Sequence, residues 1–340
     1  MDPPPKRRKL PPWLPQAVGG AVSVACLVWV LHGYPIREEL IPAIRDLDWK
    51  WVGVAVAANL ATYVVHAWRW NVLLEPVIRL RLWPTVHAVY VGLFADTVLP
   101  LRVGELIRCY LLAHWSDLRI SLSFASAAVE RLIDGLWMVA AFLLTLAFVR
   151  GIPKDLTLLV EGLGALLIIG GVLLVWIVFH KRHVHSIIKE GRWASTLRHI
   201  IEGVHLMGSP RTMAKTMLIS VLYLGLQVLF VYACFKADLM DLSFWSAGAV
   251  LAIVRLWTVV PNAPGNIGLV NAAMVAALQL LDVEKNTAKT FSIIYFAALT
   301  GPQLIAGGVA VALTGVSITE LRERARHGMR GIHAPAPEKP

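Results

Sequence analysis

Long apolar runs, separated by short polar segments, make up most of the chain. Six of these runs are long enough to cross a bilayer as helices, because about 20 residues span a hydrocarbon core of about 30 Å. They lie at residues 14–31, 51–70, 122–149, 156–179, 213–235 and 291–315. The pattern predicts an all-α, polytopic membrane protein with about six full transmembrane helices.

Shorter apolar runs occur in two places, next to proline, glycine and polar residues. Residues 86–101 rise only about 24 Å as a helix, which is too short for a full crossing, and Gly104 and charged residues follow. Residues 244–260 and 267–281 are two short limbs separated by Pro-Asn-Ala-Pro-Gly-Asn. A helix can be interrupted at membrane depth only where protein or a water-filled cavity covers the exposed backbone. We therefore predict that these two stretches are re-entrant hairpins, which enter the membrane and turn back. The alternative for the first stretch is a cytosolic amphipathic helix capped by proline and glycine.

The positions of Lys and Arg orient these segments. Basic residues gather in the tail 1–13, the loop 180–212 and the tail 318–340, and such clusters stay on the cytoplasmic side of a membrane. The exit of the second run, at Arg69–Arg81, is assigned to the same side. Both termini are then cytoplasmic. The first hairpin begins and ends inside, and the second begins and ends outside.

Two hairpins that enter from opposite faces make an inverted repeat. The first unit covers residues 51–149 and the second covers 213–315, within a single transmembrane domain at 14–317. The hairpin tips share a spacing, Leu-Pro-x-x-x-Gly-Glu at 99–105 and Val-Pro-x-x-x-Gly-Asn at 260–266. Inverted repeats with broken helices are typical of transporters whose substrate site lies near the bilayer midplane.

Composition supports the membrane class. Hydrophobic residues make up 57% of the chain and charged residues 16%, whereas soluble domains carry about 25% charged residues. The net charge of +10 is concentrated in the predicted cytoplasmic segments, so it indicates topology rather than nucleic-acid binding. Cys26, Cys109 and Cys234 are isolated and predict neither a disulfide framework nor a metal site. We expect no cofactor and no metal, and we expect the protein in the inner (cell) membrane.

Polar residues inside the apolar segments form the candidate site, because ionisable groups at membrane depth are usually functional. The candidates for binding a lipid headgroup are Arg102, Gly104, Glu105, Arg108, Glu130, Arg131, Asp134, Arg255, Asn262, Pro264, Gly265 and Asn266. Arg102 is available for a phosphate if Glu105 pairs with Arg108, and the alternative is that all of them form structural pairs. A helix that begins after Gly104 or Gly265 would present free N–H groups to an anionic headgroup.

Two further positions leave alternatives open. Glu130 and Asp134 are four residues apart and share one helix face, so they could bind a cationic lipid group or relay protons. A structural pair with Arg102 or Arg108 is the alternative. Arg255 has no acidic residue near it in sequence, so its partner is expected across the bundle or on the ligand.

Three stretches resemble the lysylphosphatidylglycerol synthase transmembrane (flippase-like) family. They are LPLRVGELIRCYLL at 99–112, AAVERLIDGL at 127–136 and VPNAPGNIGLVNAAMVAAL at 260–278, and the resemblance covers roughly 51–315. It implies lipid translocation, because the best-known members move an aminoacylated phospholipid between leaflets and others are linked to lipid-carried sugars. Members that synthesise the lipid carry a large soluble aminoacyltransferase domain. Only about 25 residues follow the last run here, so synthesis is not expected.

The expected function is transport rather than catalysis. The cargo would be a polar or anionic lipid: a phospholipid, an aminoacyl-phospholipid or a polyprenyl-phosphate-linked sugar. The alternative is a membrane-embedded accessory subunit or enzyme of lipid or glycan modification, with Glu130 and Asp134 as its acid–base pair. The chain has no HExxH or GxSxG motif. Expected partners are membrane lipids with an anionic or phosphate headgroup, and a second copy or a lipid-modifying enzyme, but no nucleic acid.

Overall fold

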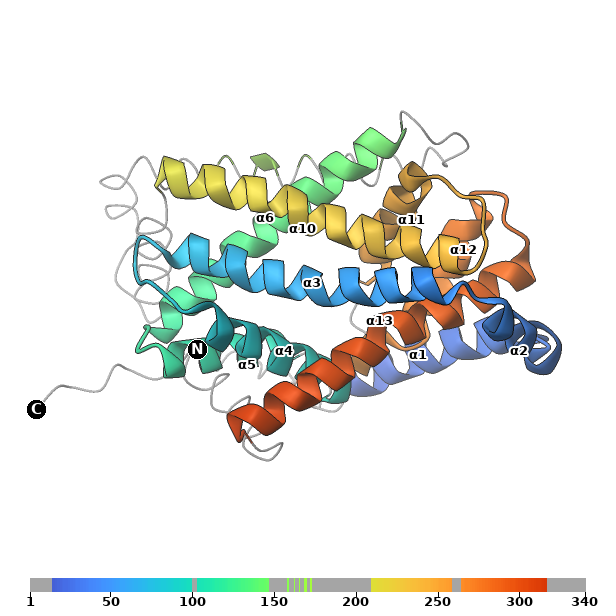
Figure 1. Cartoon of the computed structure of the whole chain (residues 1–340), viewed down its shortest axis with the longest axis horizontal. Helices are drawn as coiled ribbons and strands as arrows, with labels where there is room; N and C mark the ends of the chain where they lie inside the picture. Colours follow the sequence, from blue (N-terminus) through green and yellow to red (C-terminus); the bar gives the residue numbers. More distant parts are fainter. Residues whose placement is uncertain are drawn as a thin grey trace, which may run out of the picture.

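The computed structural model describes residues 14–99, 103–146, 209–258 and 264–316, with isolated positions between 158 and 172. All regular structure in these ranges is helical (Figure 1). The elements are α1 (Leu14–Leu31), α2 (Ile36–Asp46), α3 (Trp49–Leu74), α4 (Leu82–Val98), α5 (Gly104–Trp115), α6 (Ile120–Leu146), α10 (Pro210–Ala237), α11 (Phe244–Trp257), the 3-10 turn η2 (Pro264–Asn266), α12 (Leu269–Gln279) and α13 (Lys285–Thr314). The predicted span 156–179 and both tails lie outside the continuous ranges, as does the loop 180–212 up to residue 208.

Among the described residues, three helices are long and apolar enough to cross a membrane: α3, α10 and α13. A fourth candidate is the bent pair of α1 and α2, whose axes meet at 86°. Helix α6 has 27 residues, but Glu130, Arg131 and Asp134 lie at its middle. The long apolar runs that fall in the described ranges are thus confirmed as helices, although several extend further than predicted.

Helix α2 is an element that the sequence pattern did not predict. Residues 33–50 carry mixed charges and lie between two of the long apolar runs. However, Ile36, Leu40 and Ile44 recur every four residues, which gives the segment one apolar face and makes a helix stable against a membrane or a neighbouring helix. It packs against the C-terminal helix α13.

Helices α3 and α10 lie side by side and run in opposite directions (Figure 1). At one end, the N–H of Asp48, just before α3, donates to the carbonyl of Ala237, which ends α10, over 2.9 Å. At the other end, Glu75 directly follows α3. Its Oε2 lies 3.3 Å from Nζ of Lys215, near the start of α10. These two contacts fix the pair as antiparallel along its whole length.

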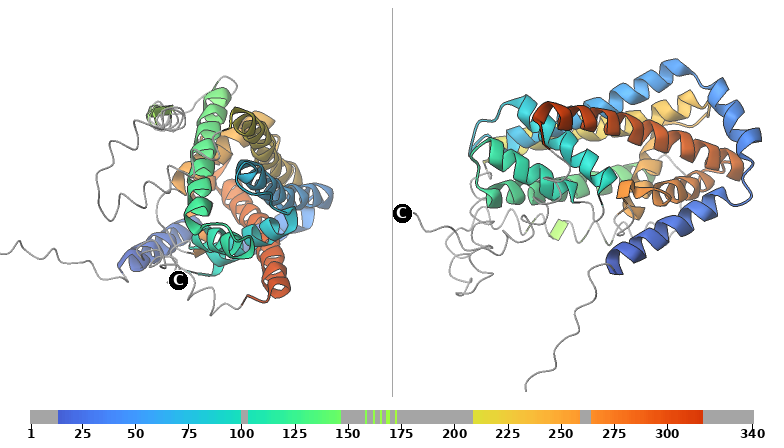
Figure 2. Two further views of the ribbon diagram at one scale, coloured as in Figure 1. Left: turned by 90° about the vertical axis from the view of Figure 1, so that its left-hand side faces the viewer. Right: turned by 90° about the horizontal axis from the view of Figure 1, so that it is seen from below.

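The helices fall into two sets of four, α3–α6 and α10–α13, each made of a long helix, two shorter ones and a second long helix. The helix contacts match when each helix is replaced by its counterpart in the other set. Helix α4 packs against α13 as α11 packs against α6, and α5 contacts α6 as α12 contacts α13. Among the described residues, each of the stronger contacts between these eight α-helices has such a counterpart. The short pairs α4–α5 and α11–α12 lie toward opposite ends of the bundle (Figures 1 and 2).

Two glycines allow α4 and α5 to approach closely. A Cβ atom on Gly104 would lie 1.9 Å from the carbonyl oxygen of Gly92 and 2.6 Å from Cγ of Asp96. A Cβ atom on Gly92 would lie 2.8 Å from the carbonyl oxygen of Gly104. The hairpin therefore closes only because neither position carries a side chain.

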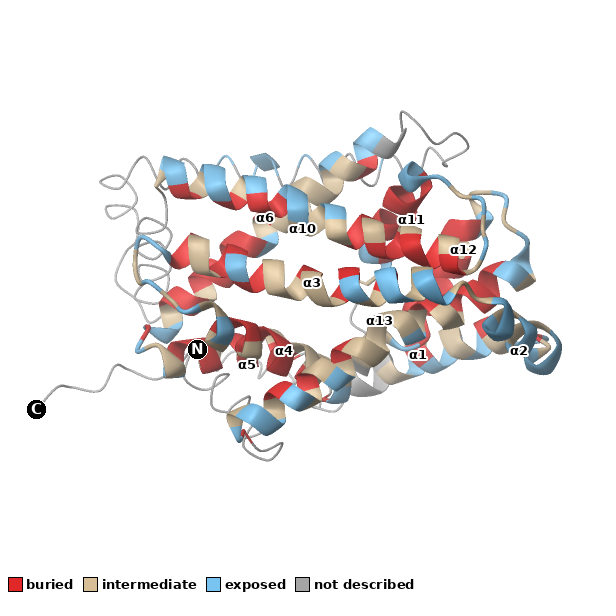
Figure 3. Ribbon diagram, viewed as in Figure 1, coloured by how far each residue is buried: buried red, intermediate tan, exposed pale blue. Residues whose placement is uncertain are grey.

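Buried residues face the interior of the bundle, and exposed residues lie on its outer surface (Figure 3). Many of the exposed side chains are large and apolar, among them Leu218, Ile305 and Leu313. Apolar side chains on the outer surface of long apolar helices suit a lipid environment.

Candidate functional site

A cavity of about 530 Å³ lies between the two short helix pairs. Its walls come from both sets of helices, with α3, α4, α5 and α6 on one side and α10–α13 on the other. The lining includes seven of the predicted site residues: Gly104, Glu105, Arg108, Arg131, Arg255, Gly265 and Asn266. Residues that are far apart in sequence thus meet around one space, as expected for a site between two hairpins.

The end of α4 meets the turn η2 at this cavity. Gly265 has a φ of +67° and Asn266 a φ of +57°, so two successive left-handed residues turn the chain toward α12. A Cβ atom on Gly265 would lie 3.3 Å from Cγ2 of Thr97 in the last turn of α4. Among the described residues, no group forms a hydrogen bond with the buried Oδ1 of Asn266.

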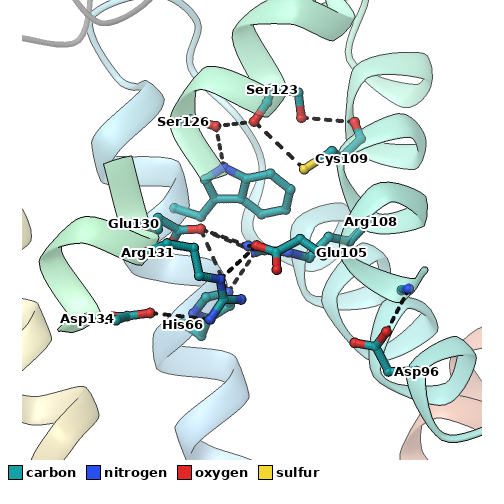
Figure 4. Close-up of polar contacts among 12 residues, drawn as sticks. His66, Asp96, Glu105, Arg108, Cys109, Ser123, Ser126, Glu130, Arg131 and Asp134 are labelled. Carbon is teal, nitrogen blue, oxygen red and sulfur yellow. Dashed lines mark hydrogen bonds and ion pairs between the residues drawn. The ribbon is translucent and has the colours of Figure 1, made fainter. Parts of the chain in front are cut away.

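Glu130, on α6, is the centre of an ion-pair network (Figure 4). It is fully buried, and its Oε2 accepts hydrogen bonds from Nη1 and Nη2 of Arg108, each over 3.2 Å. Nη1 of Arg108 also lies 2.7 Å from Nε2 of His66. Arginine is the donor in this hydrogen bond, because a guanidinium group cannot accept one. The other carboxylate oxygen, Oε1, lies 3.4 Å from Nη2 of Arg69.

Arg69 lies inside the bundle, although the sequence pattern assigned it to the cytoplasmic exit of α3. Its side chain is fully buried. It pairs with both Glu130 and Asp134, donates to Oγ of Ser220 over 3.2 Å, and lies 4.6 Å from the ring centroid of Tyr223. Two carboxylates on one face of α6 thus replace the water that the guanidinium would otherwise need. The predicted shared face of Glu130 and Asp134 is confirmed.

Glu105 and Arg131 form the part of the network that faces the cavity. Nε of Arg131 donates to Oε1 of Glu105 over 2.8 Å, and Nη2 of Arg108 donates to the same oxygen over 3.0 Å. The predicted pairing of Glu105 with Arg108 is therefore confirmed, but Glu105 is shared with Arg131. The side chain of Glu105 is 36% exposed and that of Arg131 is 53% exposed, so a ligand in the cavity can reach both.

Arg255 approaches the cavity from α11, in the other helix set. Its Nη2 donates to Oε1 of Gln227 on α10 over 2.6 Å. No carboxylate of the described residues lies within ion-pair distance of it, so its charge has no local counterpart. The expected partner across the bundle is thus an amide rather than an acid.

The first backbone N–H of α5, at Gly104, is not free for a ligand. The backbone N–H of Gly104 donates to Oδ1 of Asp96 over 2.7 Å. A carboxylate from the preceding helix therefore occupies the first turn of α5, where partial positive charge gathers. Of the remaining candidates, Pro264 begins η2, and Arg102 and Asn262 lie outside the described residues.

Sequence reasoning missed several polar residues of the site. His66 and Gln227 each hold an arginine, and Gln303 donates to the Tyr63 hydroxyl over 2.8 Å beside the cavity. His66 and Arg69 are three residues apart in an otherwise apolar run. That spacing places both on one helix face and was a sufficient signal for a polar stripe.

The arrangement suits recognition of an anion. Three arginines and two carboxylates line the cavity: Arg108, Arg131, Arg255, Asp96 and Glu105. Glu105, Glu130 and Asp134 each pair with at least one arginine. No group of three His, Cys, Asp or Glu residues in the described parts of the chain is arranged to hold a metal ion.

Comparison with known proteins identifies the family of the chain. Residues 16–307 match the family described as lysylphosphatidylglycerol synthase TM region. The chain is also similar to a UPF0104 membrane protein of Methanocaldococcus jannaschii, with 23% identity over 209 residues that cover 60% of this chain and 86% of that protein. The matched range contains every candidate site residue. The resemblance found in the sequence is thereby confirmed, and the chain belongs to the lysylphosphatidylglycerol synthase TM region family of membrane-embedded, lipid-related proteins.

Proposed function

We propose that the protein moves a polar or anionic lipid between membrane leaflets through the cavity between the two helix pairs. The cargo classes are a phospholipid, an aminoacyl-phospholipid or a polyprenyl-phosphate-linked sugar. The observation that carries the proposal is the cavity itself, which both sets of helices build and which three arginines line. A cavity at the junction of two antiparallel helix sets is where transporters with repeated halves bind their substrates.

The proposed topology has six full spans and two re-entrant hairpins in an inverted repeat. We propose that the protein lies in the inner (cell) membrane, with both termini in the cytoplasm. The antiparallel α3–α10 pair and the matched contacts of the two sets support the inverted relation. The short lengths of α4, α5, α11 and α12, at 17, 12, 14 and 11 residues, support hairpins rather than full crossings. The charge distribution supports the orientation.

We assign the phosphate of the cargo to Arg131 and Arg255. Arg255 carries a charge that no described carboxylate balances, and Arg131 is the half-exposed member of the network. Guanidinium groups bind phosphate through two parallel hydrogen bonds, and the two arginines approach from different helix sets. A headgroup held between them would link the sets to each other.

We propose transport alone, without catalysis. Glu105, Glu130 and Asp134 are each engaged in ion pairs with arginines, which supports a role in binding and structure rather than in proton transfer. The proposed partners are membrane lipids with an anionic or phosphate headgroup, together with a second copy of the chain or a lipid-modifying enzyme.

The test is reconstitution of the purified chain in liposomes that contain fluorescent phosphatidylglycerol in both leaflets. A membrane-impermeant reductant added outside removes only the outer-leaflet fluorescence. We expect vesicles with the protein to lose the protected inner fraction within minutes, while protein-free vesicles retain about half of their signal. Thin-layer chromatography of the recovered lipid provides the second readout. A chemically altered lipid without leaflet exchange would instead support the enzyme.

A further inference from the structure

A second cavity, of about 630 Å³, opens on the outer surface where α3 ends and α10 begins. We name it the end groove. Its apolar lining consists of Trp68 and Val72 from α3, Leu80 and Leu82 at the start of α4, and Leu218 and Ile219 from α10. Leu218 is 73% exposed and Trp68 is 45% exposed, so the groove is open sideways, toward the lipid.

The three charged residues of the end groove form what we call its rim, and the remaining polar residue, Asn71, hydrogen-bonds to Thr85. Arg79 is in the connection from α3 to α4, Glu75 follows α3, and Lys215 is in the second turn of α10. Nζ of Lys215 lies 3.3 Å from Oε2 of Glu75, and among the described residues Arg79 makes no ion pair. The rim therefore has two cations against one carboxylate.

In the proposed topology, the end of α3 and the start of α10 lie at the membrane surface, and the groove would then extend from the headgroups to the acyl chains. Leu218 is eight residues beyond the start of α10, about 12 Å along the helix, and Trp68 lies about 9 Å before the end of α3. The headgroup layer of one leaflet is about 5–7 Å thick. The rim residues then lie among headgroups, and the apolar walls extend beside the acyl chains.

We propose that the end groove binds an anionic glycerophospholipid of the surrounding leaflet. Arg79 and Lys215 bind its phosphate, and an acyl chain lies along Trp68 and Leu218. Charge complementarity selects this occupant, because the net positive rim favours an anionic headgroup over a zwitterionic one. The bound lipid bridges α3 to α10, the two helices that start the two sets, and it is separate from the transported lipid in the central cavity.

The test is native mass spectrometry of the full chain in detergent with added dioleoyl phosphatidylglycerol or dioleoyl phosphatidylcholine. We expect phosphatidylglycerol adducts to dominate. The double variant Arg79→Gln/Lys215→Gln is expected to lose phosphatidylglycerol affinity by roughly fivefold for each cation removed. The matched control is Lys236→Gln, which removes a cation from the other end of α10 and should leave the adducts unchanged.

Three outcomes would overturn the proposal. One is equal retention of phosphatidylglycerol by the wild type and the double variant, and another is equal binding of phosphatidylcholine by the wild type. The third is competition by glycerol 3-phosphate at the concentration of the lipid, which would indicate a site for soluble phosphates. If the double variant melts early because Glu75 loses its partner, the single variant Arg79→Gln decides, since Arg79 makes no ion pair among the described residues.

A bulky side chain tests the acyl-chain half of the groove independently of charge. Leu218→Trp should fill the space beside Trp68 and weaken the binding of both lipids several-fold. If this variant has a normal melting temperature and unchanged lipid adducts, then the acyl chain does not lie in the groove.

Discussion

Glu130 and Glu105 lie on neighbouring helices and both pair with Arg108, but only Glu105 is exposed to the cavity. Glu130 is fully buried between two guanidinium groups. Removing one partner of a buried ion pair leaves the other charge without compensation, whereas solvent compensates at an exposed pair. The two residues therefore differ in what they do for the folded state.

We predict that Glu130→Gln lowers the free energy of unfolding by about 3–5 kcal/mol. Glu105→Gln, the matched control, should lower it by less than about 1 kcal/mol. Thermal unfolding in a mild detergent measures both. Similar shifts in melting temperature for the two variants would contradict the assigned roles.

Arg255 should matter for transport and not for stability, because it donates to a single amide and balances no described carboxylate. Arg255→Lys keeps the charge but loses the planar pair of donors, and one charge-assisted hydrogen bond contributes about 1.5–3 kcal/mol. We expect translocation to fall roughly ten- to a hundredfold with little change in melting temperature. The same result is predicted for Arg102→Lys. Normal translocation by Arg255→Lys would exclude this residue from the site.

The charged candidates could be found from the sequence because each interrupts an apolar run. Their partners could not, since pairing depends on how the helices pack. Arg69 shows the difference: its position near the end of an apolar run suggested an exit to water, but two carboxylates of α6 hold it inside. Gln227, which holds Arg255, had no distinguishing charge.

At the scale of helices, most elements could be predicted from hydrophobic periodicity and from the proline and glycine breaks. The limbs predicted at 86–101, 244–260 and 267–281 correspond to α4, α11 and α12. Helix α2 was missed because its charges conceal a narrow apolar face. The close approach of α4 and α5 could not be predicted either, because it depends on which glycines meet.

Gly104→Ala should open the α4–α5 hairpin, since the new methyl group would overlap the carbonyl of Gly92. We predict a loss of at least about 1–3 kcal/mol of stability together with loss of translocation. Gly225→Ala on α10 is the control: nothing lies within 4 Å of its Cβ position, and alanine is the better helix former by about 1 kcal/mol. Equal stability of the two variants in thermal unfolding would contradict the close approach.

The N-terminus of α13 carries a pH-dependent cap. The carboxylate of Glu284 accepts the backbone N–H groups of Asn286 and Thr287, and these hydrogen bonds hold the pKa of Glu284 below its ordinary value of 4.5. The cap therefore stabilises the folded state fully above about pH 4.5 and is lost as the pH falls through the lowered pKa. We predict that Glu284→Ala lowers the melting temperature at pH 7 and that the difference disappears in stronger acid. A difference that persists at pH 2–3 would contradict this account.

At the scale of the whole molecule, the proposed topology is tested by labelling. In a background without Cys26, Cys109 and Cys234, a cysteine introduced by Thr97→Cys or Val103→Cys should react weakly or from the cytoplasmic side. The hairpin would hold both positions below the outer surface, and Thr97 lines the cavity. Strong labelling from the outside alone would refute both the hairpin and the inverted repeat.

The two helix sets match in their contacts but not in their chemistry. Arg69 and Phe230 are each the twenty-first residue of their helix, and Glu130 and Tyr295 are each the eleventh. The first set therefore holds an ion pair where the second places two aromatic rings with centroids 5.2 Å apart.

The antiparallel pairing of α3 with α10 also has a consequence for how such a bundle could arise. A shorter polypeptide holding only one set of four helices would form the same contacts if two copies inserted in opposite orientations and met across that pair. The orientation of each copy would then depend on a few lysines and arginines at its ends. Joining both sets in one chain removes that dependence, and it leaves each half free to specialise, one toward charge and the other toward aromatic packing.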